Sequence, residues 1–232
     1  MSIPYVDLFL ADPVLALRNA LRFGHFISFA IGLGGATMLD LILLRFFVSN
    51  KITSDQIDIF NFASKIINCS LIVIWITGIG FLIHYYNFDP KKLGNPKLYA
   101  KFSIIVLLTL NGVFIHHKIL PILNKQIGNS LFEKISKNQR LVFIASAAIS
   151  ATSWYTPVAL GAFSQLNFKV DAVTLLRTYL LLLVGVFAAM NLLLSYLLRA
   201  SLPAAESAIE AKSTTKLVGK LRPKALAHAV SN

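Results

Sequence analysis

Ionisable side chains lie inside several long apolar stretches of this sequence, and they are its first candidates for chemistry: His25, Asp40, His84, Lys101 and His116. An imidazole can ligate a metal ion, an ammonium group can bind an anion, and a carboxylate can carry a proton. Inside a membrane such groups are costly and usually mark a functional site. We therefore expect Lys101 and Asp40 to act as catalytic residues, and the histidines to bind a cofactor.

The composition indicates that these residues belong to a membrane protein. Of the 232 residues, 56% are hydrophobic and 14% are charged. Soluble domains carry about 25% charged residues, so this chain has too little polar surface to stay dissolved. The net charge of +12 does not indicate a nucleic-acid partner, because the basic residues lie at the ends of apolar stretches. A single cysteine, Cys69, excludes a disulfide framework.

Five apolar stretches are long enough to cross a bilayer, which takes about 20 residues each. They cover residues 23–48, 66–86, 102–123, 141–166 and 172–198. The sequence thus predicts an all-α fold, a polytopic transmembrane helix bundle of about five spans. The lipid bilayer is its expected surroundings.

Three regions follow from this pattern: an N-terminal interfacial segment over 1–22, the helix bundle over 23–199, and a basic tail over 200–232. The pair Asp12-Pro13 is typical of a helix start. Residues 13–21 are expected to form a short amphipathic helix on the membrane surface; alternatively, they are the first turns of the first span.

The distribution of basic residues predicts the orientation of the spans. Of the 22 Lys and Arg residues, 14 fall on one side of the membrane and 8 on the other. We expect the richer side to be cytoplasmic, which places the N-terminus outside and the tail inside a bacterial inner membrane. The tail either contacts anionic lipid or is a solvated segment that only maintains the orientation.

Depth along the spans sorts the candidate residues into two layers. The outer layer holds His25, His84 and Lys101, whereas Asp40 shares the inner layer with His116, His117 and Lys118. A carboxylate at the depth of Asp40 needs a partner. We expect it to pair with His116 or Lys118, or to be protonated.

Small and polar residues share a helical face with a histidine on each of the first three spans. The candidate cofactor-binding set is His25, Ser28, Gly32, Thr77, Gly80, His84 and His116. Two interpretations remain open. Small residues let transmembrane backbones pack closely; alternatively, they leave a slot for a planar group such as haem, with histidine as the axial ligand.

The segments FGHFISFAIGLGG (23–35), WITGIG (75–80) and NPKLYAKFS (95–103), followed by LNGVFIHH (110–117), resemble a family of small bacterial membrane proteins. That family includes the CopD-like copper-resistance proteins and the haem-binding protoporphyrinogen oxidase of the bacterial type. His25, Gly78, Gly80 and Lys101 match its positions within about residues 22–121. The resemblance implies a haem b held near His25 and Lys101.

The chain also departs from this family. Ala30-Ile31 replaces a tryptophan, the family's later histidine of the third span falls near Gly112, and a fifth span and a longer tail follow. It resembles even more the uncharacterised bacterial integral membrane proteins with a similar pattern, which imply no activity.

Three functional hypotheses result. In the first, His25 and His84 ligate the iron of haem b, Ser28 or Thr77 orients the imidazoles, and Lys101 binds a carboxylate; the protein transfers electrons or oxidises a small apolar substrate. In the second, the chain is a non-catalytic accessory subunit that packs on other membrane subunits. In the third, Asp40 and His116 serve a proton-coupled carrier or channel.

Overall fold

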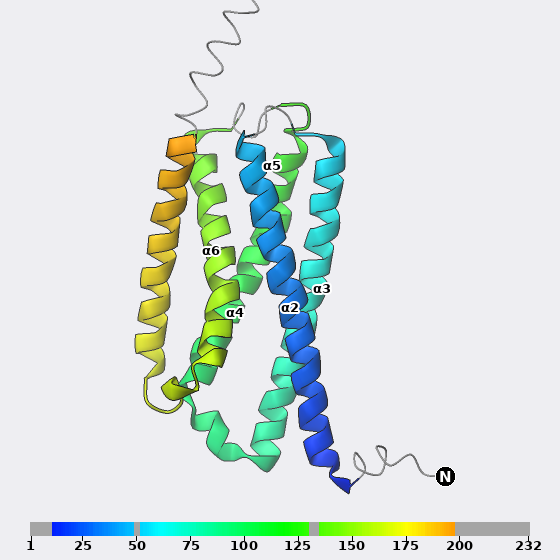
Figure 1. Ribbon diagram of the computed structural model, residues 1–232, viewed down its shortest axis with the longest axis vertical. Helices are drawn as coiled ribbons and strands as arrows, with labels where there is room; N and C mark the ends of the chain where they lie inside the picture. Colours follow the sequence, from blue (N-terminus) through cyan, green and yellow to red (C-terminus); the bar gives the residue numbers. More distant parts are fainter. Residues whose placement is uncertain (1–10, 49–51, 130–134, 198–232) are drawn as a thin grey trace, which may run out of the picture. The chain divides into compact units, whose positions relative to one another are not determined.

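The structure is a computed structural model that describes residues 11–48, 52–129 and 135–197. Five of its helices are long and apolar enough to cross a membrane, and the described residues form no strand. This confirms the predicted all-α polytopic bundle (Figure 1). The chain divides into two compact units, 1–190 and 191–232. The first contains the sites below; the second is helical over its described residues, 191–197.

The helices follow one another along the chain with short connections. They are α2 (Pro13–Val48), α3 (Ser54–Phe88), α4 (Pro96–Phe114), the π-helical turn η2 (Ile115–Ile119), α5 (Leu120–Asn124) and α6 (Lys137–Ala162). Two 3-10 turns, η1 (Pro90–Gly94) and η3 (Ser164–Leu166), lie in the loops. The fifth span is Ala172–Leu197.

The first span begins at the predicted Asp12-Pro13 pair. The Asp12 carboxylate accepts a hydrogen bond from the backbone N–H of Leu15 at 2.9 Å, which caps the helix. Residues 13–21 continue without a break into α2, so the alternative expectation, that they are the first turns of the first span, describes them. Residues 1–10 and the tail from 198 onward lie outside the described residues.

The second span begins earlier than hydropathy alone predicts. Thr53 and Gln56 form a capping box, with side chain and backbone bonded in both directions, and α3 starts at Ser54 rather than near 66. The added turns are amphipathic and bury Ile57 and Phe60. Residues 54–65 include too many polar side chains to be recognised as part of a span by hydropathy averaged along the sequence.

Contacts between loops show which helix ends lie together. Backbone hydrogen bonds join Ile52 to Gly128 and Asn129 in a short bridge, so the first and third loops share one end of the bundle. At the other end, the Asn95 side chain donates to that of Asn167 at 3.3 Å. The expected two layers of candidate residues therefore exist.

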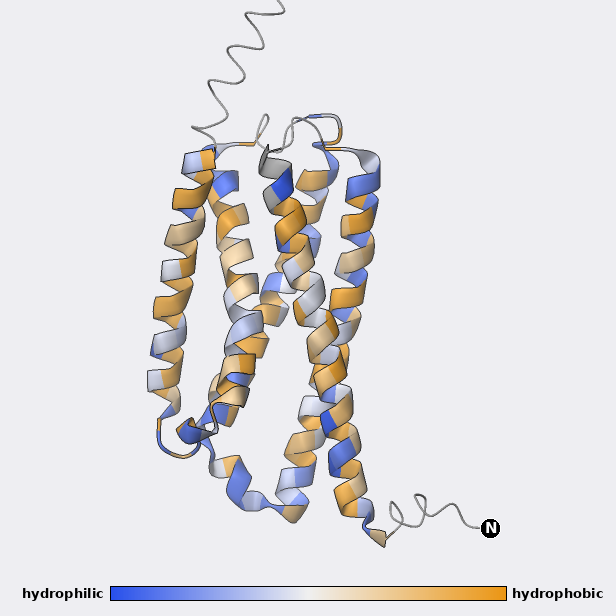
Figure 2. Cartoon of the chain, in the orientation of Figure 1, coloured by the Kyte–Doolittle hydropathy of each residue, from blue (hydrophilic) through white to orange (hydrophobic). Residues whose placement is uncertain are grey.

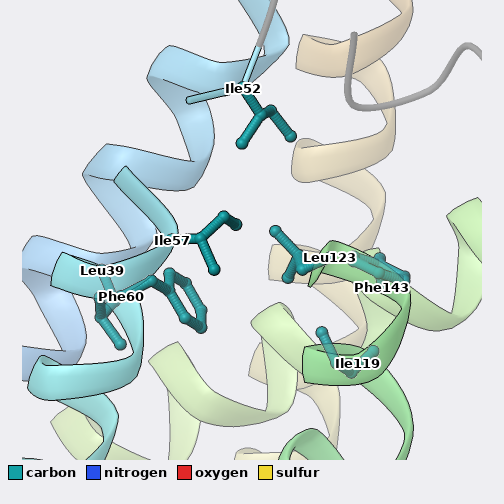
Figure 3. Packing of buried hydrophobic residues seen from close by; sticks show 7 residues of the cluster. All are labelled: Leu39, Ile52, Ile57, Phe60, Ile119, Leu123 and Phe143. Carbon is teal, nitrogen blue, oxygen red and sulfur yellow. The ribbon is translucent and has the colours of Figure 1, made fainter. Parts of the chain in front are cut away.

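Three apolar clusters hold the helices together, while many large apolar side chains are exposed. Apolar residues predominate along the helices (Figure 2). Near the loop bridge, Ile52, Ile57, Phe60, Leu123 and other residues form the first cluster (Figure 3). The middle cluster surrounds Trp154. The third joins α4 and α6 to the fifth span.

Candidate functional site

A partly open cavity of about 880 Å³ lies among α2, α3, α4 and α6, in the layer predicted to hold His25 and Lys101. Its wall is mainly aromatic and aliphatic, with Phe29, Trp75, Phe81, Tyr85, Tyr99 and Phe102. Small-molecule sites in proteins typically measure about 300–1,000 Å³ and combine an apolar wall with a few polar groups. Here those groups include His25 and Lys101, and no carboxylate lines the cavity.

The imidazole of His25 is fixed by a hydrogen bond to the neighbouring helix. Its Nδ1 lies 2.7 Å from the Oγ1 of Thr77. The Thr77 hydroxyl lies 2.7 Å from the carbonyl oxygen of Val73 and 3.1 Å from that of Ile74. Its only hydrogen is donated to these two carbonyl oxygens of α3. The oxygen therefore accepts from His25, which assigns the proton to Nδ1 and leaves a lone pair on Nε2.

Ring contacts also hold His25 in place. The Phe81 ring meets it edge-on with centroids 5.6 Å apart, and Phe29 lies at 6.1 Å. Of the two predicted orienting residues, Thr77 makes the contact. Ser28 is buried and donates to the carbonyl of Gly24, one turn earlier in its own helix, at 2.7 Å.

Lys101 lies in the second turn of α4 and lines the same cavity. Its Nζ is near Gly161, where an added Cβ would lie 3.5 Å away. Lys101 forms no ion pair with a carboxylate of the described residues, among which the one ion pair joins Lys92 to Asp89. The neighbouring Lys97, by contrast, donates to the carbonyl of Phe163 at 2.8 Å. The ammonium of Lys101 is available to an anionic ligand.

The structure does not bring His84 into this cavity. His84 is buried and packs against Tyr85 and Phe88, and it is absent from the cavity wall. Its Nδ1 has no hydrogen-bond partner among the described residues. Since His84 lies seven residues after Thr77, two helical turns, both share the α3 face that meets α2. The predicted pair of facing imidazoles is therefore not assembled at the cavity.

The predicted slot at Gly32 and Gly80 is occupied by side chains. A Cβ at position 32 would overlap the indole of Trp154, and one at position 80 would lie 2.6 Å from Leu21. For these two glycines, close packing is the correct interpretation. The cavity lies beside a different glycine of α3, Gly78, whose Cβ direction is open.

Asp40 and His116 are in the opposite layer, around a smaller cavity of about 90 Å³. Asp40 follows His25 by about four turns of α2, or roughly 22 Å. Lys118 and His117 are exposed. Among the described residues Asp40 forms no ion pair, so its predicted pairing with Lys118 is not found, whereas His116 shares its cavity.

The fourth span lines part of the larger cavity, which its hydropathy pattern did not predict. Pro157, Val158, Gly161 and Ala162 of α6 complete its wall. The sequence did contain an indication of this, because Pro157 and Gly161 lie one turn apart on the same helix face. Proline has no backbone N–H and glycine has no side chain, so this face of the helix is irregular and open.

No family model, curated protein or solved structure matches this chain. The resemblance seen in the sequence thus remains a resemblance. The class of ligand is therefore inferred from the residues that line the larger cavity.

Proposed function

We propose that this multi-pass membrane protein binds haem b in the larger cavity, where His25 would hold the iron, for electron transfer or oxidation of a small apolar substrate. The observation that supports this most directly is the hydrogen bond from His25 Nδ1 to Thr77, which leaves Nε2 free beside a large apolar cavity. Metal-ligating histidines almost always donate their other ring N–H in this way.

The cavity suits a flat apolar ligand with an anionic edge. Its aromatic wall matches the faces of a porphyrin, and its volume of about 880 Å³ lies within the range for cofactor sites. Lys101 would bind a propionate, because its ammonium has no carboxylate neighbour within the described chain. No acidic residue lines the wall to repel that propionate.

The roles of the chain's own residues follow from their positions. His25 would hold the iron, Thr77 would fix its tautomer, and Lys101 would orient the carboxylate edge. The bound iron would supply one-electron redox chemistry, and the aromatic wall would limit access of water. Asp40, the other candidate catalytic residue, lies in the opposite layer and takes no part at this site.

The visible spectrum of the haem-loaded protein tests the role of His25. With His84 outside the cavity, His25 is the histidine of the wall that would hold the iron. We expect the purified chain, expressed with excess haem, to show a Soret band that shifts when carbon monoxide is added after chemical reduction. His25→Ala should lose the haem, whereas His117→Ala, which changes an exposed residue, should keep it. A colourless protein after haem reconstitution would contradict the proposal.

The accessory-subunit function is the second candidate. It is favoured by the filled glycine positions, Gly32 and Gly80, which act in packing rather than in ligand binding. A colourless protein that co-purifies in fixed proportion with other membrane subunits would support it.

The orientation is proposed on the basic residues alone, with the N-terminus outside and the tail in the cytoplasm of a bacterial inner membrane. The 14 basic residues on the tail's side of the bundle and the 8 on the other support it. Contact of the basic tail with anionic lipid is part of the same proposal.

A further inference from the structure

The smaller cavity is built around an irregular turn of the third span. At Ile115–Ile119 the helix changes from α to π geometry before it continues as α5. Single π turns inside α-helices occur frequently at functional sites. This one contains His116, whose Nε2 is hydrogen-bonded to the side-chain amide of Asn68 on α3. The irregular turn thus presents an imidazole to the interior of the bundle.

Polar groups from each of the surrounding helices meet at this cavity. They are Asp40 from α2, Ser64 and Asn68 from α3, Asn111 and His116 from the third span, and Ser146 and Ser150 from α6. A water molecule needs about 10–15 Å³ of such space and two to four polar partners. The volume of about 90 Å³ therefore admits several waters.

Some of these polar groups have hydrogen-bond partners within the described chain, and others do not. Asn111 and Ser146 satisfy each other: the amide donates to the Ser146 carbonyl at 3.0 Å, and the Ser146 hydroxyl donates to the Asn111 oxygen at 2.9 Å. Within the described chain, the carboxylate of Asp40 has neither a hydrogen bond nor an ion pair. The second ring nitrogen of His116 is likewise left for a further partner.

We propose that this cavity is a proton-binding site in which Asp40 and His116, connected by water, hold one proton between them. The proton is bound either to the carboxyl oxygen of Asp40 or to a ring nitrogen of His116, and transfer through water breaks one bond and forms the other. Both arrangements carry no net charge, which removes the cost of an isolated charge in the membrane. Asn68 can hydrogen-bond to His116 in either arrangement. Its amide NH₂ donates to the neutral imidazole, and after the amide rotates, its oxygen accepts from the charged imidazolium.

Within the described chain, no third titratable residue lines this cavity, and Arg140 lies one turn before Phe143 on the same face of α6, with a buried Nε that has no partner among the described residues. The cavity-lining residues of α3 and α6 carry hydroxyl, amide or apolar side chains, and Asp40 and His116 are the titratable residues of the wall. His117 and Lys118 on the same turn are exposed. The site is also separate from the larger cavity, because Trp154, Leu71, Ile74 and Leu108 pack between the helices in the middle cluster. It therefore does not depend on haem binding.

The proposal can be tested on the full chain in lipid nanodiscs. Infrared spectroscopy reports whether the Asp40 carboxyl is protonated, and ¹⁵N NMR of labelled histidine reports the charge of His116. At pH 7, the two groups together should carry one proton. A total of zero or two would overturn the proposal.

Single variants make the result specific. His116→Gln should leave Asp40 protonated at pH 7, with a carbonyl band that shifts in D₂O because water reaches it. Asp40→Asn should leave His116 neutral at pH 7, and His117→Gln is the matched control that should change neither signal. A charged His116 in Asp40→Asn, or an ionised Asp40 in His116→Gln, would overturn the proposal. Far-UV circular dichroism checks that each variant is folded.

Discussion

His25 Nδ1 and Thr77 Oγ1 lie 2.7 Å apart, and this hydrogen bond joins the first two spans at the wall of the larger cavity. The hydroxyl hydrogen is already engaged with carbonyls of α3, so Thr77 acts as the acceptor. One side chain thus determines both the orientation and the tautomer of the imidazole.

Replacing Thr77 with valine keeps the side-chain shape and removes the acceptor. We expect the haem affinity of Thr77→Val to fall about 10–100-fold, the usual effect of losing such a partner of a metal ligand. Thr77→Ser retains a hydroxyl and should bind nearly as the unchanged protein does. Spectroscopic titration with haem measures both, and equal affinities for all three proteins would show that the hydrogen bond has no such role.

Lys101 should recognise a carboxylate of the ligand. A hydrogen bond to a charged group is worth about 1.5–3 kcal/mol, so Lys101→Met should weaken haem binding at least tenfold. Haem dimethyl ester lacks the charge, and its affinity should be nearly the same for both proteins. Lys91→Met, which changes an exposed residue of the η1 loop, is the control. A comparable loss for the ester would mean that Lys101 acts through packing.

Close packing at Gly32 should make this position intolerant of any side chain. Gly32→Ala forces Trp154 to move, and overpacking of this kind costs about 1–3 kcal/mol. Gly34→Ala is the matched control, because its Cβ would meet nothing within 4 Å. Thermal unfolding in detergent should show a lower midpoint only for the first variant; equal midpoints would mean that the indole moves freely.

The start of the fifth span offers a prediction on pH. The hydroxyl and backbone N–H of Thr174 donate to the Asp171 carboxylate at 2.6 and 2.7 Å, and these bonds lower the pKa of Asp171. A lowered pKa means that the stabilisation is present above the ordinary value of 3.8 and is lost as the pH falls through the lower, folded-state value. Thr174→Val should raise the pKa of Asp171 in an NMR titration, and an unchanged pKa would contradict this assignment.

Membrane orientation can be measured with reporter fusions. A reporter that is active only outside the cytoplasm should be active when inserted in the loop around η1 and inactive when fused after Asn232. The opposite result would invert the topology and leave both cavities as they are.

Hydropathy, helical phase and span direction were enough to predict the five spans and the two layers. Helical phase also put Ser28 and Thr77 on the faces that carry His25 and His84, and of these two candidate orienting residues Thr77 contacts His25. These are properties of single helices and their order, which a sequence contains directly.

The shape of the larger cavity could not be predicted in the same way. Phase puts Gly80 and His84 on one face of α3, yet whether that face meets a neighbour or a cavity depends on the rotation of the whole helix. Leu21 fills the space beside Gly80, and the opening lies at Gly78 instead. The π turn at His116, by contrast, comes just before Pro121, which has no backbone N–H to donate to the carbonyl of His117, so the local residues carried a signal for an irregular turn there.

The apolar layer around Trp154 has an electrical consequence. Roughly 22 Å of α2 separates His25 from Asp40, and the side chains packed between them form a region of low dielectric constant. A transmembrane voltage would fall mainly across this region, so charges in the two cavities would experience different potentials. At about 2.3 kcal/mol per charge for each 100 mV, an energised membrane would favour electron or proton uptake at one cavity over the other.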